Sequence, residues 1–211
     1  MSQIIREEIG NNQVVQFAVL SGPSFAREVV LRHPTAVVVG ANHNAVALMV
    51  QNVVSTPYFR TYTNSDVLGV ELGGAYKNVI AIAAGVADGL GYEYNTGAAL
   101  VTRGLAEISR LGIKMGAHYS TFLGLACLGD LVLTATRPAS RNRTVGNRLG
   151  KGEKLADILA GMKMGAEGIL TTKAICLRGE KYDVELPIAQ KVYEILFQNK
   201  DPRRAVHELM E

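Results

Sequence analysis

Short apolar runs alternate with turn residues and amphipathic stretches in the first part of the chain. S-G-P-S at residues 21–24 predicts a turn that opens onto a helix with Pro23 in its first turn. A second helix is predicted after the turn at 40–43, with Asn42 as its cap. Runs rich in Val, Phe, Tyr and Thr predict three β-strands, at residues 14–20, 35–40 and 58–63. This order predicts part of an α/β sheet with crossover helices, as in nucleotide-binding folds.

The pattern changes near residue 65, where strand signals fade and apolar residues recur at three and four positions. This spacing predicts a series of helices at residues 65–89, 96–111, 121–136, 140–149, 154–161, 167–177, 187–198 and 202–210. We therefore expect an α/β domain in residues 1–64 and a mostly α-helical domain in residues 65–211.

Composition and charge narrow the function classes. Of the 211 residues 48% are hydrophobic, and 22 Lys and Arg against 19 Asp and Glu give a net charge of +3, too small to indicate nucleic-acid binding. The N-terminus is amphipathic and acidic, unlike a secretory signal, and the longest apolar run, residues 79–87, is about half a membrane span. Cys127 and Cys176 lack metal-binding spacing. We expect a cytoplasmic protein with two free thiols, no metal site and no membrane span.

One lysine stands at the start of a long run of Ala, Ile and Val. Lys77 lies in G-G-A-Y-K-N, residues 73–78, and on a helix its face also carries Gly73, Gly74 and Ile80. Small neighbours let another element approach closely, and partial desolvation would lower the lysine pKa toward the range useful for proton transfer. The alternative is a lysine whose stem lies along the helix and whose ammonium reaches water.

Three further motifs place polar groups at predicted helix starts. L-S-G-P-S-F-A at residues 20–26 exposes backbone N–H groups and a hydroxyl that could bind an anion. S-R-N-R at 140–143 offers guanidinium groups that match phosphate geometry, with Ser140 as a cap. G-A-E-G at 165–168 places an acidic residue where the helix dipole favours it. Plain capping, or a solvated basic helix face, explains each motif equally simply.

A carboxylate lies within the apolar run L-G-D-L-V-L-T at residues 128–134. Asp130 has Thr134 one helical turn beyond it on the same face. Because an unpaired carboxylate is costly to bury, Asp130 needs a partner. That partner is either a cap, a structural Lys or Arg, or the ligand together with the lysine.

In their order and in their residues these motifs resemble one family, the NAD(P)-dependent glycerol-3-phosphate dehydrogenases of the bacterial type. The blocks that carry the resemblance are S-G-P-S-F-A, G-G-A-Y-K-N-V-I-A-I-A-A-G, G-L-A-C-L-G-D-L-V-L-T, S-R-N-R and E-G. It runs from about residue 14 to the end, with Tyr76 where the family often has Leu. The resemblance implies an oxidoreductase that interconverts sn-glycerol 3-phosphate and dihydroxyacetone phosphate with NAD or NADP, and so supplies glycerol 3-phosphate for phospholipid biosynthesis.

The resemblance also implies a role for individual residues. Lys77 would be the catalytic proton donor and acceptor at the reacting oxygen. The residues that would bind the substrate are Gly22, Ser24, Lys77, Asp130, Ser140, Arg141 and Asn142. Those that would contact the nicotinamide cofactor are Ala26, Arg141, Gly165 and Glu167. The partner is a small phosphate ester, and the abundance of apolar helix is compatible with a homodimer.

One feature of the family has no match. The chain contains no G-x-G-x-x-G turn, the motif that cradles a cofactor pyrophosphate, and the nearest sequence is G-L-G-Y-E-Y at 89–94. We therefore expect residues 1–64 to be an incomplete, C-terminal part of a Rossmann-type nucleotide-binding domain, and this chain to be inactive alone. The alternative is a non-catalytic remnant, a helical module for phosphate-ester binding or dimerisation. A dehydrogenase acting on a 3-hydroxy acid fits less well, because Lys77 with S-R-N-R favours a phosphorylated substrate.

Overall fold

The computed structural model describes residues 2–9, 15–138, 140–162 and 165–211. Backbone contacts divide the chain into two compact units. The first comprises Met1–Gly74 and Ala117–Asp130, and the second comprises Ala75–Gly116 and Leu131–Glu211. The long helix α4 (Val67–Gly89) begins in the first unit and ends in the second. The predicted architecture, a small sheet followed by a mostly helical region, is confirmed.

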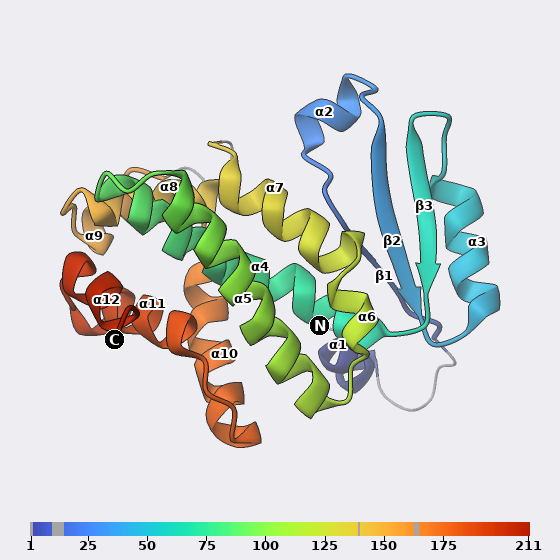
Figure 1. Ribbon diagram of the computed structural model, residues 1–211. Helices are drawn as coiled ribbons and strands as arrows, with labels where there is room; N and C mark the ends of the chain where they lie inside the picture. The colour runs from blue at the N-terminus through green and yellow to red at the C-terminus, as the bar shows by residue number, and fades with distance from the viewer. Residues whose placement is uncertain (1, 10–14, 139, 163–164) are drawn as a thin grey trace. The chain divides into compact units, whose positions relative to one another are not determined.

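The first unit contains a three-stranded sheet in the order β1-β2-β3 (Figure 1). β1 (Ala18–Ser21) pairs antiparallel with β2 (Thr35–Ala41), and β2 pairs parallel with β3 (Phe59–Asn64). Helix α3 (Asn44–Val54) connects the parallel pair and packs Ala47 against Val39 and Ala41 of β2. Among the described residues, only β2-α3-β3 is thus a crossover unit. The first strand is shorter than predicted, and Val14 lies outside the described residues.

Two predicted helix starts are wrong. Helix α2 (Ala26–Val30) begins after Phe25, so Pro23 precedes it. The Ser24 hydroxyl donates to the Gly22 carbonyl at 3.0 Å, and this local turn delays the helix. Helix α3 has His43 in the cap position, without a side-chain cap bond, because β2 continues to Ala41 and Asn42 falls in the connecting bend.

The predicted helix over residues 121–136 is interrupted. It is divided into α6 (Tyr119–Phe122), the π-helix η1 (Leu125–Gly129) and α7 (Asp130–Thr136). Gly124 is extended, with φ −93° and ψ −173°, and ends the first turn. The π-helix then packs Ala126 against Val38 and Val70 of the first unit. The N-terminal helix α1 (Ser2–Ile9) is attached there too, since Ser2 N and Oγ donate to the Glu71 carboxylate at 2.9 Å.

The second unit is helical. Besides the end of α4 it contains α5 (Tyr94–Met115), α8 (Arg141–Gly150), α9 (Leu155–Ala160), α10 (Glu167–Tyr182), α11 (Pro187–Gln198) and α12 (Pro202–Glu208). Helix α11 has the predicted bounds, as expected for Pro at its first position. Helix α10 runs five residues beyond its predicted end and stops at Asp183, which has φ +51°. The core of the second unit includes Tyr76, Ile80, Ile108 and Leu111, all with an exposed fraction of 0%.

Helices α4 and α8 contact each other through glycines. A Cβ on Gly85 would lie 2.0 Å from the Arg143 carbonyl oxygen, and one on Gly146 would lie 2.0 Å from the Ile82 carbonyl oxygen. One turn further on, Gly89 and Gly150 make the same kind of approach. Because neither backbone leaves room for a side chain, the four glycines fix how close α8 lies to α4. This contact sets the position of the α8 N-terminus, where S-R-N-R lies.

Two stretches are long and apolar enough to cross a membrane by length and composition, Val67–Gly89 and Tyr119–Thr136. In the first, 67% of the most apolar window is buried within the structure, as is usual for a core helix.

Candidate active site

The residues expected to form a site fall on both units. In the second unit, α4 carries Lys77, which is half-buried and so is compatible both with a partly desolvated lysine and with one whose ammonium reaches water. Helix α8 begins directly after Ser140, whose hydroxyl accepts a hydrogen bond from Arg143 N at 3.3 Å. The predicted cap is confirmed. Its C-terminal neighbours, Arg141 and Asn142, form the first turn of α8, where backbone N–H groups favour an anion.

A buried amide joins three helices of this unit. Asn142, 4% exposed, donates from Nδ2 to Oδ1 of Asn78 at 3.0 Å and accepts at Oδ1 from Gly168 N at 2.9 Å. Asn78 follows Lys77 on α4, and Gly168 follows Glu167 on α10. A Cβ on Gly168 would lie 2.7 Å from Asn142 Oδ1, so the close approach requires glycine. Asn142 thereby links the S-R-N-R motif both to α4, the helix that carries Lys77, and to the E-G motif.

Arg141 makes the second connection between these motifs. Its Nη1 donates to the Gly165 carbonyl at 3.1 Å, and its Nη2 pairs with Oε1 of Glu167 at 2.8 Å. The Arg141 and Glu167 side chains are 41% and 59% exposed, so a ligand can reach both. Glu167 starts α10 as predicted. The structure therefore brings Arg141, Asn142, Gly165 and Glu167 together with the segment that carries Lys77.

In the first unit, the S-G-P-S turn leaves the end of β1. Gly22 has φ +143°, and a Cβ there would lie 2.9 Å from Val37 Cα, so the turn requires glycine twice over. Ser24 bonds to Gly22 as described, and Ala26 begins α2. Ser21 Oγ donates to the Ala126 carbonyl of η1 at 3.2 Å, which fixes the turn against the π-helix.

Asp130 begins α7 directly after the π-helix. Asp130 and Thr134 are 3% and 6% exposed and lie one turn apart on this helix. The π-helix adds an extra residue to its turn, and such turns are frequent at functional sites. Sequence periodicity could not reveal this feature.

Two basic residues of the S-R-N-R region have structural partners. Arg143 forms an ion pair with Asp88 of α4, whose pKa is raised by burial. Arg148 pairs with Glu153 at 2.5 Å and donates to the Ile158 carbonyl at 3.3 Å. For these two arginines the structure favours helix packing over ligand binding.

Sequence reasoning missed Asn78 and Glu107. Asn78 stands in an apolar helical run, which is a detectable signal for a buried amide. Glu107, 1% exposed on α5, accepts from the Tyr76 hydroxyl at 2.9 Å and from Ile188 N at 2.7 Å. Burial raises the pKa of Glu107, although these hydrogen bonds oppose the shift. Tyr76, the departure from the resembled motif, thus has a specific partner.

Comparison with known families agrees with this arrangement. The family described as NAD-dependent glycerol-3-phosphate dehydrogenase C-terminus matches residues 66–207, and the corresponding N-terminus family matches residues 1–47. The chain belongs to the NAD-dependent glycerol-3-phosphate dehydrogenase family. It is 57% identical over 210 residues to "Glycerol-3-phosphate dehydrogenase [NAD(P)+]" of Citrifermentans bemidjiense, covering 100% of this chain and 63% of that relative.

Other relatives give the same result. The Geobacter sulfurreducens protein of the same name is 59% identical over 194 residues, which are 92% of this chain and 58% of that relative. A crystal structure of glycerol-3-phosphate dehydrogenase from Coxiella burnetii superposes with a TM-score of 0.95 at 40% identity, covering 100% of this chain and 64% of that one. The chain thus spans less than two thirds of the length of these family members.

The part of a nicotinamide cofactor expected at this site would meet the start of α10. Arg141 and Glu167 are reachable from solvent and stand at the start of α10, where a polar ligand would find a guanidinium, a carboxylate and the Gly165 carbonyl. The donor and acceptor set suits an amide-bearing ring. The family's pyrophosphate cradle, the G-x-G-x-x-G turn, does not occur in the sequence.

Proposed function

We propose that the protein is an oxidoreductase that interconverts sn-glycerol 3-phosphate and dihydroxyacetone phosphate with NAD or NADP. The supporting observation is the Asn142 amide, which is bonded both to Asn78, beside Lys77, and to Gly168, beside Glu167. It links the three motifs that a lysine-assisted reduction of a phosphorylated ketone needs. The names of the relatives, with 57% and 59% identity, support the same substrate and cofactors.

The roles follow from charge and position. A reduced nicotinamide cofactor, when bound, would supply the hydride that the ketone carbon receives. Negative charge then develops on the carbonyl oxygen, and the Lys77 ammonium stabilises it and delivers the proton that completes the alcohol. In the reverse direction Lys77 accepts that proton from the hydroxyl. Asp130 and Thr134 would hold the lysine in place.

Binding of the phosphate would fall to the start of α8. The Arg141 guanidinium, the Ser140 hydroxyl and the remaining Asn142 N–H can each donate to phosphate oxygens, and the helix dipole adds to the attraction. By the family resemblance, Gly22 and Ser24 are further substrate residues, and Ala26, Gly165 and Glu167 are cofactor residues. Holding the phosphate orients the carbonyl toward Lys77, because remote contacts position the reacting carbon. A cytoplasmic location and a homodimer belong to the same proposal.

The direct test is oxidation of NADH and NADPH in the presence of dihydroxyacetone phosphate. We expect turnover from the full reading frame that encodes this chain and little or none from the 211 residues alone. Lys77→Ala in the full reading frame should lower kcat by about 10²- to 10⁴-fold, the usual range for a general acid. Lys173→Ala, which removes an exposed lysine of α10, is the matched control.

Near-normal kcat for Lys77→Ala, in a variant with unchanged circular dichroism, would overturn the assigned role. A full reading frame that binds phosphate esters without turnover would instead favour the non-catalytic module. Robust turnover by the 211 residues alone would contradict the expected incompleteness of the nucleotide-binding domain.

A further inference from the structure

The second unit contains an apolar cavity that none of the expected site residues lines. It has a volume of about 250 Å³ and lies among α4, α5, α11 and α12. Of the fifteen described residues that line it, eleven are apolar, among them Val86, Leu100, Val192 and Ile195. A cavity of this composition favours an apolar ligand, because water inside it would find few hydrogen-bond partners.

The cavity is open to solvent beside the last residues of the chain. Met210 lines it and is nevertheless 80% exposed, and Ala99 on α5 lines it from an exposed position. A ligand can therefore enter without unfolding of a helix.

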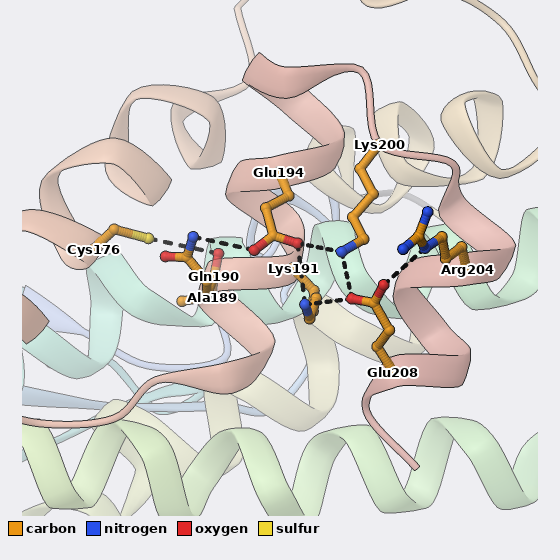
Figure 2. Close-up of polar contacts among 8 residues, drawn as sticks. All are labelled: Cys176, Ala189, Gln190, Lys191, Glu194, Lys200, Arg204 and Glu208. Carbon is orange, nitrogen blue, oxygen red and sulfur yellow. Dashed lines mark hydrogen bonds and ion pairs between the residues drawn. The ribbon is translucent and has the colours of Figure 1, made fainter. Parts of the chain in front are cut away.

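Most charges around α11 and α12 are already neutralised. Figure 2 shows Lys191, another lining residue, between the carboxylates of Glu194 at 3.1 Å and Glu208 at 2.6 Å. Lys200 pairs with both of these carboxylates, and Arg204 pairs with Glu208. Hydrogen bonds from Lys191 and Lys200 lower the pKa of Glu208 to about 2, so the Glu208 carboxylate stays ionised near neutral pH. Because Lys191 is already paired with two carboxylates, its attraction for a further anion is weakened.

Arg103 of α5 differs from these residues. It lines the cavity, is exposed, and donates from Nη1 to the main-chain carbonyl of Leu209 at 2.9 Å. Within the described part of the chain no carboxylate forms an ion pair with it. The mouth of an apolar cavity therefore carries one guanidinium that is held in place but not neutralised. A guanidinium in this setting can form a bidentate, charge-assisted pair with a carboxylate.

We propose that this cavity binds a small amphipathic carboxylate with a single apolar chain, such as a medium-chain fatty acid. The apolar chain of the ligand lies among α4, α5 and α11, and its carboxylate binds Arg103. The site is separate from the residues proposed for dehydrogenase activity, and its occupancy does not depend on that activity.

A homologous series tests the apolar part of the proposal. Hexanoate, octanoate and decanoate are titrated into the 211-residue chain below their micelle concentrations, with isothermal titration calorimetry and methyl NMR as readouts. We expect saturable one-to-one binding whose affinity rises about fourfold for each added methylene until the cavity is full. The methyl shifts should concentrate on Val192, Ile195 and Leu209.

Two variants separate the contribution of the apolar cavity from that of the contact between Arg103 and the carboxylate. Ala99→Phe places a ring in the cavity from an exposed position and should abolish decanoate binding while leaving the fold intact. Arg103→Gln should weaken decanoate by about tenfold or more yet leave decanol unchanged. Arg178→Gln, which removes an exposed arginine of α10, is the matched control and should alter neither ligand.

Other outcomes overturn the proposal. Absence of saturable binding, an affinity independent of chain length, or full affinity in Ala99→Phe would each exclude a fatty acid in this cavity. Equal decanoate binding by Arg103→Gln and the wild type would exclude the carboxylate contact. If a second copy of the chain covers the cavity instead, Ala99→Phe will dissociate a dimer in analytical ultracentrifugation and the wild type will bind no decanoate.

Discussion

Glu107 is the residue at which burial and hydrogen bonding oppose each other most directly. Its carboxylate is 1% exposed and accepts from the Tyr76 hydroxyl of α4 and from the first N–H groups of α11, those of Ile188 and Ala189. These N–H groups have no partner within their own helix, so Glu107 supplies the cap that α11 lacks. Burial nevertheless dominates and raises the pKa of Glu107. One side chain thus joins α4, α5 and α11.

This raised pKa predicts a specific pH dependence of stability. A carboxyl group whose pKa is higher in the folded than in the unfolded state favours folding while it is protonated. That contribution is fully present below the unfolded value of about 4.3 and is lost as pH rises through the folded value. Glu107→Gln removes this titration. We expect its free energy of unfolding, measured in urea from pH 4 upward, to fall less with pH than that of the wild type; parallel curves would contradict the assignment.

Tyr76 should contribute through its hydroxyl. Tyr76→Phe keeps the buried ring but removes a donor to Glu107, so we expect a loss of about 1–3 kcal/mol in the free energy of unfolding. Tyr193→Phe is the control, because within the described residues the Tyr193 hydroxyl has no hydrogen-bond partner while its ring packs on Phe197. Equal effects of the two substitutions in urea unfolding would show that the Tyr76–Glu107 bond contributes nothing.

Among the helices, α4 and α8 form the contact with the strictest steric demand. Gly146→Ala places a Cβ 2.0 Å from the Ile82 carbonyl oxygen, so the helices must separate. We expect destabilisation of about 1–3 kcal/mol or more, as for other overpacked sites. Gly97→Ala in α5 meets nothing within 4 Å and should stabilise the protein by up to about 1 kcal/mol, since alanine is the better helix former. Thermal unfolding of both variants checks the contrast; a Gly146→Ala protein as stable as Gly97→Ala would rule out the close contact.

Elements with strong local signals were predictable from the sequence. Pro187 at the first position of α11 and the Ser140 cap of α8 are examples, because each acts within one turn. The π-helix at Leu125–Gly129 and the delayed start of α2 were not, since tertiary contacts of Ala126 and a side-chain turn at Ser24 determine them. At the site, Lys77 and Arg141 carried recognisable motifs. Asn78 belongs to the lysine motif, but its role and that of Glu107 could not be predicted, because they depend on partners 64 and 31 residues away.

For the molecule as a whole, the expected site residues are divided between two units joined by a continuous α4. The residues proposed to bind the phosphate, Ser140, Arg141 and Asn142, lie in the second unit together with Lys77. The sequence contains no glycine-rich turn to bind a pyrophosphate. Phosphate-ester binding and dinucleotide binding should therefore be separable properties of this chain.

Titration calorimetry on the 211-residue chain tests that separation. We expect dihydroxyacetone phosphate to bind, with an affinity that falls as salt is added because an exposed guanidinium contributes. Arg141→Gln should weaken it by about 10- to 100-fold, the usual cost of a charged hydrogen bond, whereas Arg178→Gln should leave it unchanged. NADH should bind only weakly, because the sequence contains no glycine-rich turn to hold its pyrophosphate. Tight binding of NADH by the 211-residue chain would mean that other residues bind the NADH pyrophosphate. An unchanged affinity of Arg141→Gln for dihydroxyacetone phosphate would show that the start of α8 does not bind the phosphate.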